Sequence, residues 1–127
     1  MPIPKIIHQL WKTQDVPPRY QALALNWQQQ HPDWDYRLWT DQAIRAFVAT
    51  HFPDFLATFD GYTDNICRAD AGRYMILSHF GGLYVDLDAE CLRPFDEITG
   101  NHEFIIGLEP PEHLSEDLFQ GYVLKDL

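Results

Sequence analysis

The sequence predicts an α/β protein in which one sheet carries helices on its faces. Apolar, β-prone segments at residues 5–11 and 34–39 alternate with segments whose apolar residues recur at helical spacing. A third apolar, β-prone segment, residues 83–88, follows a long helical stretch that ends in two glycines. This alternation is typical of α/β folds. Because such sheets bind ligands beyond the carboxyl ends of their strands, we expect site residues where these segments end.

The first half of the chain predicts two units of a strand followed by a helix. The first expected strand is KIIHQLW, residues 5–11, which lies between a proline and a polar loop. A helix follows at residues 18–30 and begins with proline, which is favoured in the first helical turn. Residues 34–39 are the second expected strand. Residues 40–52 then carry an apolar stripe behind Thr40, which is a suitable N-cap.

The second half predicts a short helical piece, a long helix and further strands. Pro53 and Gly61 bracket the short piece. The long helix covers residues 63–82, with Thr63 as its N-cap and Gly81 as its C-terminal stop. Extended segments are then expected at residues 83–88, 90–95 and 103–109.

Length and charge indicate a compact acidic domain. The 127 residues suffice for one domain, and 46% hydrophobic and 14% aromatic residues favour a packed core. Nineteen acidic against nine basic residues give a formal net charge of −10, which argues against non-specific binding to nucleic acid or to an anionic membrane. The N-terminus has no signal-peptide pattern, and no apolar run approaches a membrane span. We therefore expect a cytoplasmic protein, free or peripherally attached to a membrane, without a transmembrane segment.

The two cysteines predict no metal site. Cys67 and Cys91 match no Cys-x-x-Cys or Cys/His ligand pattern. Both lie in apolar segments, which favours buried free thiols over a disulfide.

Two carboxylates stand close together in the segment GGLYVDLDAE, residues 81–90. Side chains i and i+2 of an extended strand share a face, so Asp86 and Asp88 are expected to repel one another unless a cation lies between them. Mg²⁺ and Mn²⁺ prefer carboxylate oxygens and accept phosphate oxygens in their remaining positions. A metal that arrives with a diphosphate ligand would supply the missing charge. The alternative is a solvated pair of turn carboxylates, and the motif alone leaves both interpretations open.

The helix before this segment carries a second charged pair. Asp70 and Arg73 are three residues apart and are therefore neighbours on one helical face. The arginine could pair with phosphate or sugar oxygens, and the aspartate could accept hydrogen bonds from sugar hydroxyls. A surface ion pair worth only about 0.2–0.5 kcal/mol is an equally good interpretation.

Several separated motifs together resemble one known family. They are IPKIIHQLWKT, PPRY, NWQQQHPDWDYRLWTD and RADAGRYMILSHFGGLYVDLDAECLRPFD, and they span roughly residues 2–98. In these motifs the chain is similar to the Asp-x-Asp glycosyltransferases of family 32, which include fungal initiation-specific α-1,6-mannosyltransferases and bacterial polysaccharide-building enzymes. The resemblance implies a Rossmann-like nucleotide-diphospho-sugar transferase fold of the GT-A type, incomplete at its C-terminus, and transfer with retention of anomeric configuration.

The resemblance also implies roles for individual charged residues. It identifies Asp86 and Asp88 as catalytic and metal-binding residues, with Asp88 on a divalent metal that bridges to the donor diphosphate. Mn²⁺ is favoured over Mg²⁺. Asp86 would contact the metal through water, or would contact the ribose and sugar of the donor. Asp70 and Arg73 match the helix pair that holds the donor sugar.

Two aromatic residues complete the implied donor site. Trp11, at the end of the first strand, matches an aromatic residue that stacks on the nucleotide base, an interaction worth about 1–3 kcal/mol. Tyr84 matches a residue of the same pocket. For both residues a place in the core is the alternative, for Trp11 beside Trp39. His8, on the same strand as Trp11, is expected to be structural.

The implied partners are a nucleotide-sugar donor, GDP-mannose or a UDP-sugar, and a glycan, lipid-linked or protein acceptor. Residues 1–127 are expected to form a single glycosyltransferase domain that holds the nucleotide-sugar-binding part, because family members usually continue further at the C-terminus. A donor-binding remnant without catalysis is one alternative. A haloacid-dehalogenase-type phosphohydrolase with Asp86 as nucleophile is a weaker one, since Glu90 stands where that motif has Thr or Val.

Overall fold

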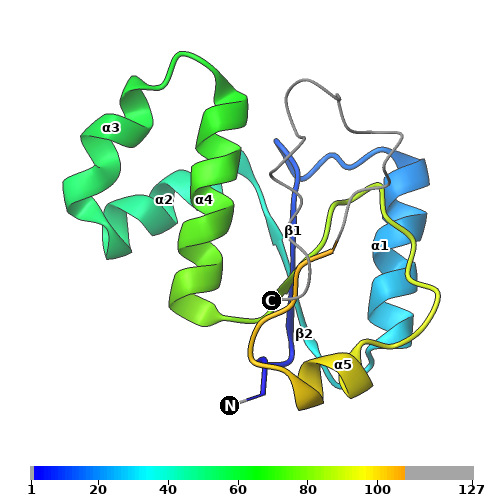
Figure 1. The fold of residues 1–127 in the computed structure, drawn as a ribbon. Coiled ribbons are helices and arrows are strands. Elements are labelled where there is room, and N and C mark those ends of the chain that lie inside the picture. Colours follow the sequence, from blue (N-terminus) through cyan, green and yellow to red (C-terminus); the bar gives the residue numbers. More distant parts are fainter. Residues whose placement is uncertain (1, 108–127) are drawn as a thin grey trace, which may run out of the picture.

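A parallel three-stranded sheet forms the centre of the described part of the chain (Figure 1). The structure is a computed structural model that describes residues 2–107. The strands are β1 (Ile6–Leu10), β2 (Asp35–Trp39) and β3 (Leu83–Tyr84), and their order in the sheet is β2-β1-β3. β1 runs parallel to both neighbours, with Leu10 opposite Trp39 and His8 opposite Tyr84. The predicted α/β class is confirmed.

The order of the strands creates a switch point beside β1. The chain leaves β1 for β2 on one side and later returns to β3 on the other side. Ligands of open α/β sheets bind at such a point, beyond the carboxyl ends of the strands. Trp11 directly follows β1 and Val85 directly follows β3. The backbone therefore places these segments beside each other at the expected position of a site.

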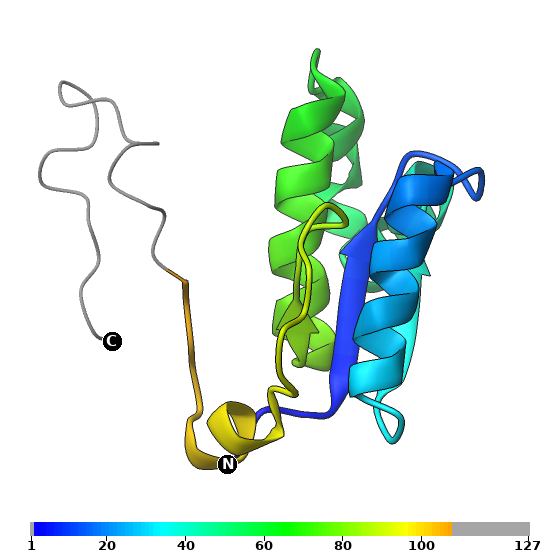
Figure 2. The ribbon, with the colours of Figure 1, turned by 90° about the vertical axis from the view of Figure 1, so that its right-hand side faces the viewer.

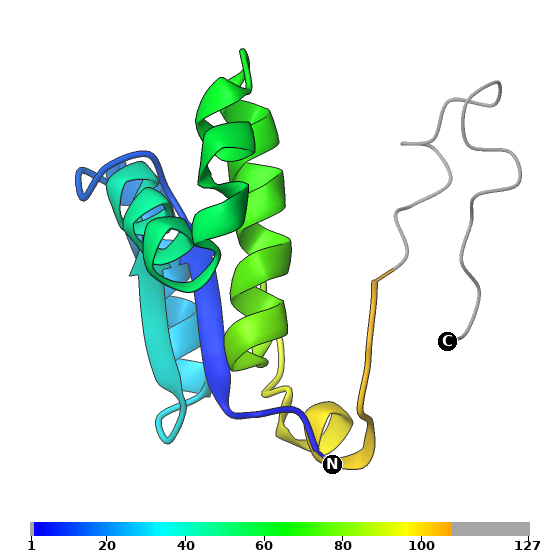
Figure 3. The ribbon, with the colours of Figure 1, turned by 90° about the vertical axis from the view of Figure 1, so that its left-hand side faces the viewer.

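Helices cover both faces of the sheet, with α1 on one face and α2, α3 and α4 on the other (Figures 2 and 3). The helical elements are α1 (Pro18–Gln30), α2 (Asp41–His51), the 3₁₀ turn η1 (Pro53–Phe55), α3 (Leu56–Gly61), α4 (Asn65–Phe80) and α5 (Asp96–Asn101). α5 lies at the amino ends of the strands (Figure 1), where the Ile3 amide donates to the Thr99 carbonyl at 3.0 Å. α5 therefore does not cover the carboxyl ends of the strands.

Each face of the sheet has its own hydrophobic core. On the α1 face, Ile7 of β1 packs with Trp27 and Trp34. On the other face, Phe47 and Ile76 join helices α2 and α4. The three central residues of β1 are buried, as is usual for a parallel strand that is covered on both sides.

The ends of the helices follow local capping rules. The Thr40 hydroxyl accepts a hydrogen bond from the Ala43 amide at 3.1 Å, which confirms Thr40 as the N-cap of α2. For α4 the N-cap is Asp64, whose carboxylate accepts from the Ile66 amide at 3.1 Å, and not the predicted Thr63. Gly81 ends α4 with a φ of 68°, as its role as a helix stop requires.

The structure corrects the predictions for the region after α4. Of the strand expected at residues 83–88 only Leu83–Tyr84 is formed, because a turn replaces the extended backbone at Asp86. Residues 90–95 and 103–107 form no strand, since the sheet of the described residues ends at β3. Residues 108–109, the end of the last expected strand, lie outside the described residues. α5 has no counterpart among the expected elements.

The two cysteines are free thiols, as predicted. Cys91 is buried, but Cys67 is exposed on α4, so the expected burial of Cys67 is wrong. The apolar character of the segment around Cys67 does not bury it, because the helix turns that position towards solvent.

His8 connects three elements beneath the carboxyl ends of the strands. The Trp39 indole N–H donates to His8 Nδ1 at 3.1 Å, and His8 Nε2 lies 2.9 Å from the Gly81 carbonyl oxygen. Because Nδ1 accepts, Nε2 carries the proton and donates to Gly81. His8 is fully buried, and burial lowers the pKa of its imidazole below the ordinary value of 6.5. His8 is therefore structural, as predicted.

The folded protein is expected to lose stability as the pH falls below 6.5, the ordinary pKa of histidine. In that range the unfolded chain binds a proton that the buried His8 resists, so the free energy of unfolding decreases until the lowered pKa of His8 is reached. Urea unfolding at about pH 5 and pH 8 measures this difference. The difference should be smaller in His8→Gln and unchanged in His102→Gln, a control at an exposed histidine. Equal pH dependence of the parent and His8→Gln would contradict the prediction.

Candidate functional site

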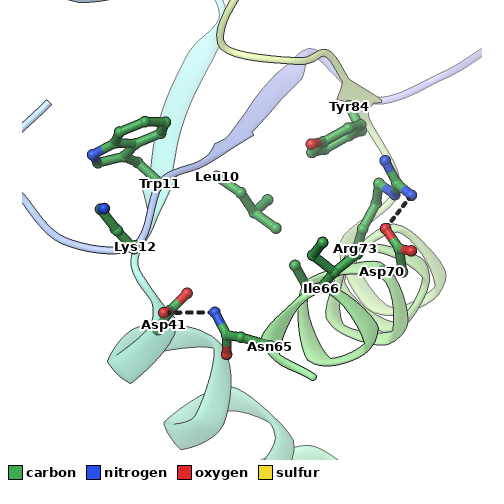
Figure 4. Close-up of a pocket in the computed structure, with 10 residues that line it drawn as sticks. Leu10, Trp11, Lys12, Asp41, Asn65, Ile66, Asp70, Arg73 and Tyr84 are labelled. Atoms are coloured by element: carbon green, nitrogen blue, oxygen red, sulfur yellow. Dashed lines mark hydrogen bonds and ion pairs between the residues drawn. The ribbon is translucent and has the colours of Figure 1, made fainter. Parts of the chain in front are cut away.

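A cavity of about 280 Å³ opens beyond the carboxyl ends of β1 and β3 (Figure 4). Its walls come from the segment after β1, the start of α2, one face of α4, and β3. The lining residues are Leu10, Trp11, Lys12, Asp41, Asn65, Ile66, Ala69, Asp70, Arg73 and Tyr84. Four of the six predicted site residues, Trp11, Asp70, Arg73 and Tyr84, therefore surround one space.

Trp11 forms the wall of the cavity on the β1 side. Its backbone amide donates to the Trp39 carbonyl at 3.0 Å, which continues the pairing of β1 with β2 for one more residue. Its indole N–H donates to the Asp15 carbonyl at 3.2 Å, and its ring meets the Tyr20 ring edge-on with centroids 5.5 Å apart. These contacts fix a half-buried ring that faces the cavity (Figure 4). Trp11 belongs to neither hydrophobic core, whereas the partly buried Trp39 packs against the core between α2 and α4.

The charged pair of α4 forms the wall opposite Trp11 (Figure 4). The Arg73 guanidinium donates to Asp70 Oδ1 at 2.7 Å. The side chain of Arg73 is 27% exposed and that of Asp70 is 54% exposed, so the arginine is the more sheltered partner. The Arg73 guanidinium carbon also lies 4.9 Å from the centre of the Tyr84 ring. The pair is thus part of a cavity wall and not an isolated ion pair of the surface.

Tyr84 links this wall to the first carboxylate of the Asp-x-Asp motif. Its hydroxyl donates to Asp86 Oδ1 at 3.1 Å while its ring contacts Arg73. Burial raises the pKa of Tyr84 to about 12, and the neighbouring Asp86 charge acts in the same direction. Tyr84 therefore keeps its proton near neutral pH and remains a donor to Asp86.

The two carboxylates of the motif lie on a turn and not on a strand. The Ala89 amide donates to the Asp86 carbonyl at 3.1 Å, which closes a four-residue turn with Asp86 in its first position and Asp88 in its third. Both aspartates are exposed, and Leu87 between them is buried. The expectation that the pair shares one face of an extended strand is therefore wrong. Asp86 reaches the cavity wall through Tyr84, whereas Asp88 does not line the cavity.

Helix α1 anchors the chain that leaves this turn. The Trp27 indole N–H donates to the Ala89 carbonyl at 2.9 Å. The Asn26 side chain accepts from the Cys91 amide at 2.7 Å and donates to the Cys91 carbonyl at 3.1 Å. The turn is thus held between β3 on one side and α1 on the other.

Sequence reasoning missed several residues of the cavity. Lys12 and Asp41 lie two residues beyond the last residues of β1 and β2, so the rule that ligands bind beyond strand ends could have indicated them. The Asn65 amide donates to the Asp41 carboxylate at 2.9 Å and closes the cavity between α2 and α4 (Figure 4). No sequence signal identified Asn65, because its position depends on how α2 packs against α4.

Arg68 turns away from the cavity. Its guanidinium donates to the carbonyls of Phe59 at 3.2 Å, Asp60 at 3.3 Å, and Tyr62. Arg68 therefore satisfies the C-terminal carbonyls of α3 and joins that helix to α4.

Within residues 2–107, no group of three or more histidine, cysteine, aspartate and glutamate side chains is arranged to hold a metal ion. In the same range no helix is long and apolar enough to cross a membrane.

Comparison with known proteins gives a consistent result. Residues 17–105 match the family described as "Glycosyltransferase sugar-binding region containing DXD motif". Inositol phosphoceramide mannosyltransferase 1 of Schizosaccharomyces pombe is 40% identical over 120 residues, which cover 92% of this chain and 38% of the relative. Inositol phosphoceramide mannosyltransferase 3 of the same yeast is 48% identical over 96 residues, covering 76% of this chain and 27% of the relative.

A more distant relative is the initiation-specific alpha-1,6-mannosyltransferase of Candida albicans, 31% identical over 112 residues that cover 83% of this chain and 29% of the relative. The chain thus spans less than two fifths of the length of these three relatives. No solved structure matches it significantly. Because the family match covers most of the chain and includes the Asp86–Asp88 motif, the chain belongs to the family of glycosyltransferases whose sugar-binding region contains a DXD motif.

Proposed function

We propose that the chain is the donor-binding part of a metal-dependent glycosyltransferase that moves a sugar, with mannose favoured, from a nucleotide-diphosphate sugar to an acceptor. The observation that carries the proposal is the cavity at the carboxyl ends of β1 and β3. The Trp11 ring lies on one wall of the cavity. Asp70, Arg73 and Tyr84 form the opposite wall, and Asp86 is bound to that wall by the Tyr84 hydroxyl.

The lining of the cavity suits a ligand with an aromatic end. Trp11 offers a fixed ring on which a nucleotide base can stack, and such stacking is worth about 1–3 kcal/mol per base. Lys12, on the same wall, adds a positive charge. Asp41 and Asn65, at the closed side, offer polar atoms to the ribose or base. The base is therefore proposed to lie at the Trp11 side of the cavity.

The charges around the cavity favour a cation bound together with the donor. Asp70, Asp86 and Asp88 would repel the phosphates of the donor, and Arg73 is already paired with Asp70. Mg²⁺ and Mn²⁺ are usually bound through one or two carboxylates, with water and phosphate oxygens in the other positions. The two exposed carboxylates of the Asp86–Ala89 turn fit that donor set. When bound, the metal would offset the negative charge of the diphosphate leaving group.

The wall formed by Asp70, Arg73 and Tyr84 is proposed to bind the sugar and the phosphates. Arg73 is sheltered by the Tyr84 ring and presents its guanidinium to the cavity, where it can donate to phosphate or sugar oxygens. Asp70 can accept from sugar hydroxyls while it holds Arg73 in place. Tyr84 orients the Asp86 carboxylate by donating to it. Together these groups are proposed to orient the sugar so that its anomeric carbon faces the acceptor.

The relatives favour mannose as the sugar, because their names describe mannosyltransferases. GDP-mannose is accordingly the first donor to test, and UDP-sugars are the second. The names of two relatives also suggest a lipid-linked acceptor, an inositol phosphoceramide, among the glycan, lipid and protein acceptors considered. A GT-A type fold, retention of anomeric configuration and a preference for Mn²⁺ are further parts of the proposal.

The proposal is tested by calorimetric titration of the 127-residue chain with GDP-mannose in the presence of Mn²⁺. Arg73→Met is expected to weaken binding about 10- to 100-fold, because a hydrogen bond to a charged group is worth about 1.5–3 kcal/mol. The matched control is Arg45→Met. Arg45 forms an exposed ion pair with Asp60 at 2.8 Å and does not line the cavity, so the affinity should not change.

Two further ligands are titrated for comparison. UDP-glucose has another base and another sugar, and free mannose has the sugar without the nucleotide. A parent chain that binds neither GDP-mannose nor UDP-glucose would overturn the proposed donor site. Equal losses in Arg73→Met and Arg45→Met would show that charge alone, and not the cavity, determines binding.

A further inference from the structure

A glutamine lies at the centre of the sheet, where an apolar residue is the norm. Gln9 belongs to β1, which is covered on both faces, and its side chain is fully buried. Burying an amide is costly unless its donors and acceptors find partners. Gln9 has partners on both sides, since its Nε2 donates to the Asp86 carbonyl at 3.2 Å and its Oε1 accepts from the Tyr36 hydroxyl at 2.6 Å.

The carbonyl that Gln9 contacts is the one that closes the Asp-x-Asp turn. The Asp86 oxygen accepts from Gln9 Nε2 and also from the Ala89 amide at 3.1 Å. A carbonyl oxygen has two lone pairs, so both are used. The backbone of Asp86 is therefore tied to the central strand by a side chain 77 residues earlier in the sequence. The direction of this one carbonyl decides where the turn presents both of its carboxylates.

Tyr36 holds the oxygen end of the Gln9 amide. A free amide can rotate by half a turn and exchange its oxygen and nitrogen. The Asp86 carbonyl can only accept, so it takes the Nε2 end of the amide, and the Tyr36 hydroxyl donates to the remaining Oε1 and holds the amide in that orientation. Burial raises the pKa of Tyr36 to about 12, so the hydroxyl keeps the proton that it donates. The contacts form a continuous line from β2 through β1 to the motif.

We propose that Gln9 and Tyr36 are positioning residues, which hold the Asp86–Ala89 turn so that its two carboxylates can share a divalent cation with the donor. The inference rests on the proposed function, because it concerns the same metal-dependent donor site. Neither residue touches the donor. Each acts through the backbone of Asp86, in the way that outer partners commonly orient the ligands of metal sites.

The test compares GDP-mannose affinity with and without Mn²⁺ in the full 127-residue chain. The ratio of the two dissociation constants is the metal-dependent gain. Gln9→Met keeps the size of the side chain but removes both hydrogen bonds, and Tyr36→Phe removes only the hydroxyl that holds the amide oxygen. We expect either change to lower the metal-dependent gain about 10-fold, since loss of such an outer partner typically costs about 10–100-fold in metal affinity. Affinity without metal should stay within about 2-fold of the parent.

The control is Gln28→Met, which makes the same change at an exposed glutamine whose amide donates to the Ala24 carbonyl within α1 at 3.3 Å. It should leave both affinities unchanged. Tyr36→Phe decides the outcome if Gln9→Met does not fold. A parent chain without any metal-dependent gain would reject the proposed function itself. A parent with a gain that both variants retain would overturn the inference, and so would an equal fall of affinity with and without Mn²⁺, which indicates general loss of structure.

Discussion

Replacing Asp88 by asparagine is expected to weaken Mn²⁺-dependent binding of GDP-mannose about 100-fold or more. The reason is electrostatic, since one carboxylate charge about 4 Å from a cation contributes several kcal/mol even at an effective dielectric constant of about 20. Asparagine keeps the shape of the side chain and removes only the charge. Calorimetry with and without Mn²⁺ separates a loss of metal binding from a general loss of affinity, because binding of GDP-mannose without the metal should change little.

The matched control for this prediction lies two residues further along the chain. Glu90 is exposed and close to the turn, but it is not part of the Asp-x-Asp motif. Glu90→Gln removes the same amount of charge and should leave the metal-dependent binding near that of the parent. If Asp88→Asn and Glu90→Gln behave alike, Asp88 has no direct part in binding the cation.

Replacing Gly82 by alanine is expected to lower the free energy of unfolding by about 2–6 kcal/mol. Gly82 has a φ of +97°, and a Cβ atom there would lie 2.6 Å from the Ile6 carbonyl oxygen and 3.1 Å from His8 Nε2. The unfavourable backbone conformation costs about 1–3 kcal/mol, and the crowding of a packed site costs about 1–3 kcal/mol more. Such a loss is a large part of the total stability of a domain, which is typically about 5–15 kcal/mol.

Urea unfolding of Gly82→Ala and Gly100→Ala makes the comparison direct. Gly100 lies in α5, and a Cβ atom added there meets nothing within 4 Å. In this helix alanine should be neutral or stabilising by up to about 1 kcal/mol. A Gly82→Ala protein as stable as the parent would show that the loop between α4 and β3 can shift away from β1 without cost.

Much of the fold follows from signals that are local in the sequence. The spacing of apolar residues and the caps predict α1, α2 and α4 to within about two residues. The resemblance to the family indicated Trp11 and Tyr84, and both line the cavity. The helix predictions succeed because apolar spacing and caps depend on residues only a few positions apart.

The failures concern contacts between distant parts of the chain. The pattern of Val85 and Leu87 fits a strand as well as a turn. The turn is held by Gln9 and Trp27, which lie 77 and 62 residues away from their partners. Residues 103–107 have the apolar alternation of a strand, but a strand also needs a neighbour, and within residues 2–107 the sheet ends at β3. The roles of Asp70, Arg73, Asp86 and Asp88 in binding, like the cytoplasmic location, stay predictions.

The cavity draws its walls from β1, from the start of α2, from α4 and from β3, which follow one another across most of the described chain. A molecule that fits it can bind only after all these elements have assembled, so it binds the native state and not the denatured one. At a concentration about 100 times its dissociation constant, such a molecule adds about 2.7 kcal/mol to the free energy of unfolding. A rise in melting temperature on adding a nucleotide sugar would thus identify the donor before any acceptor is known.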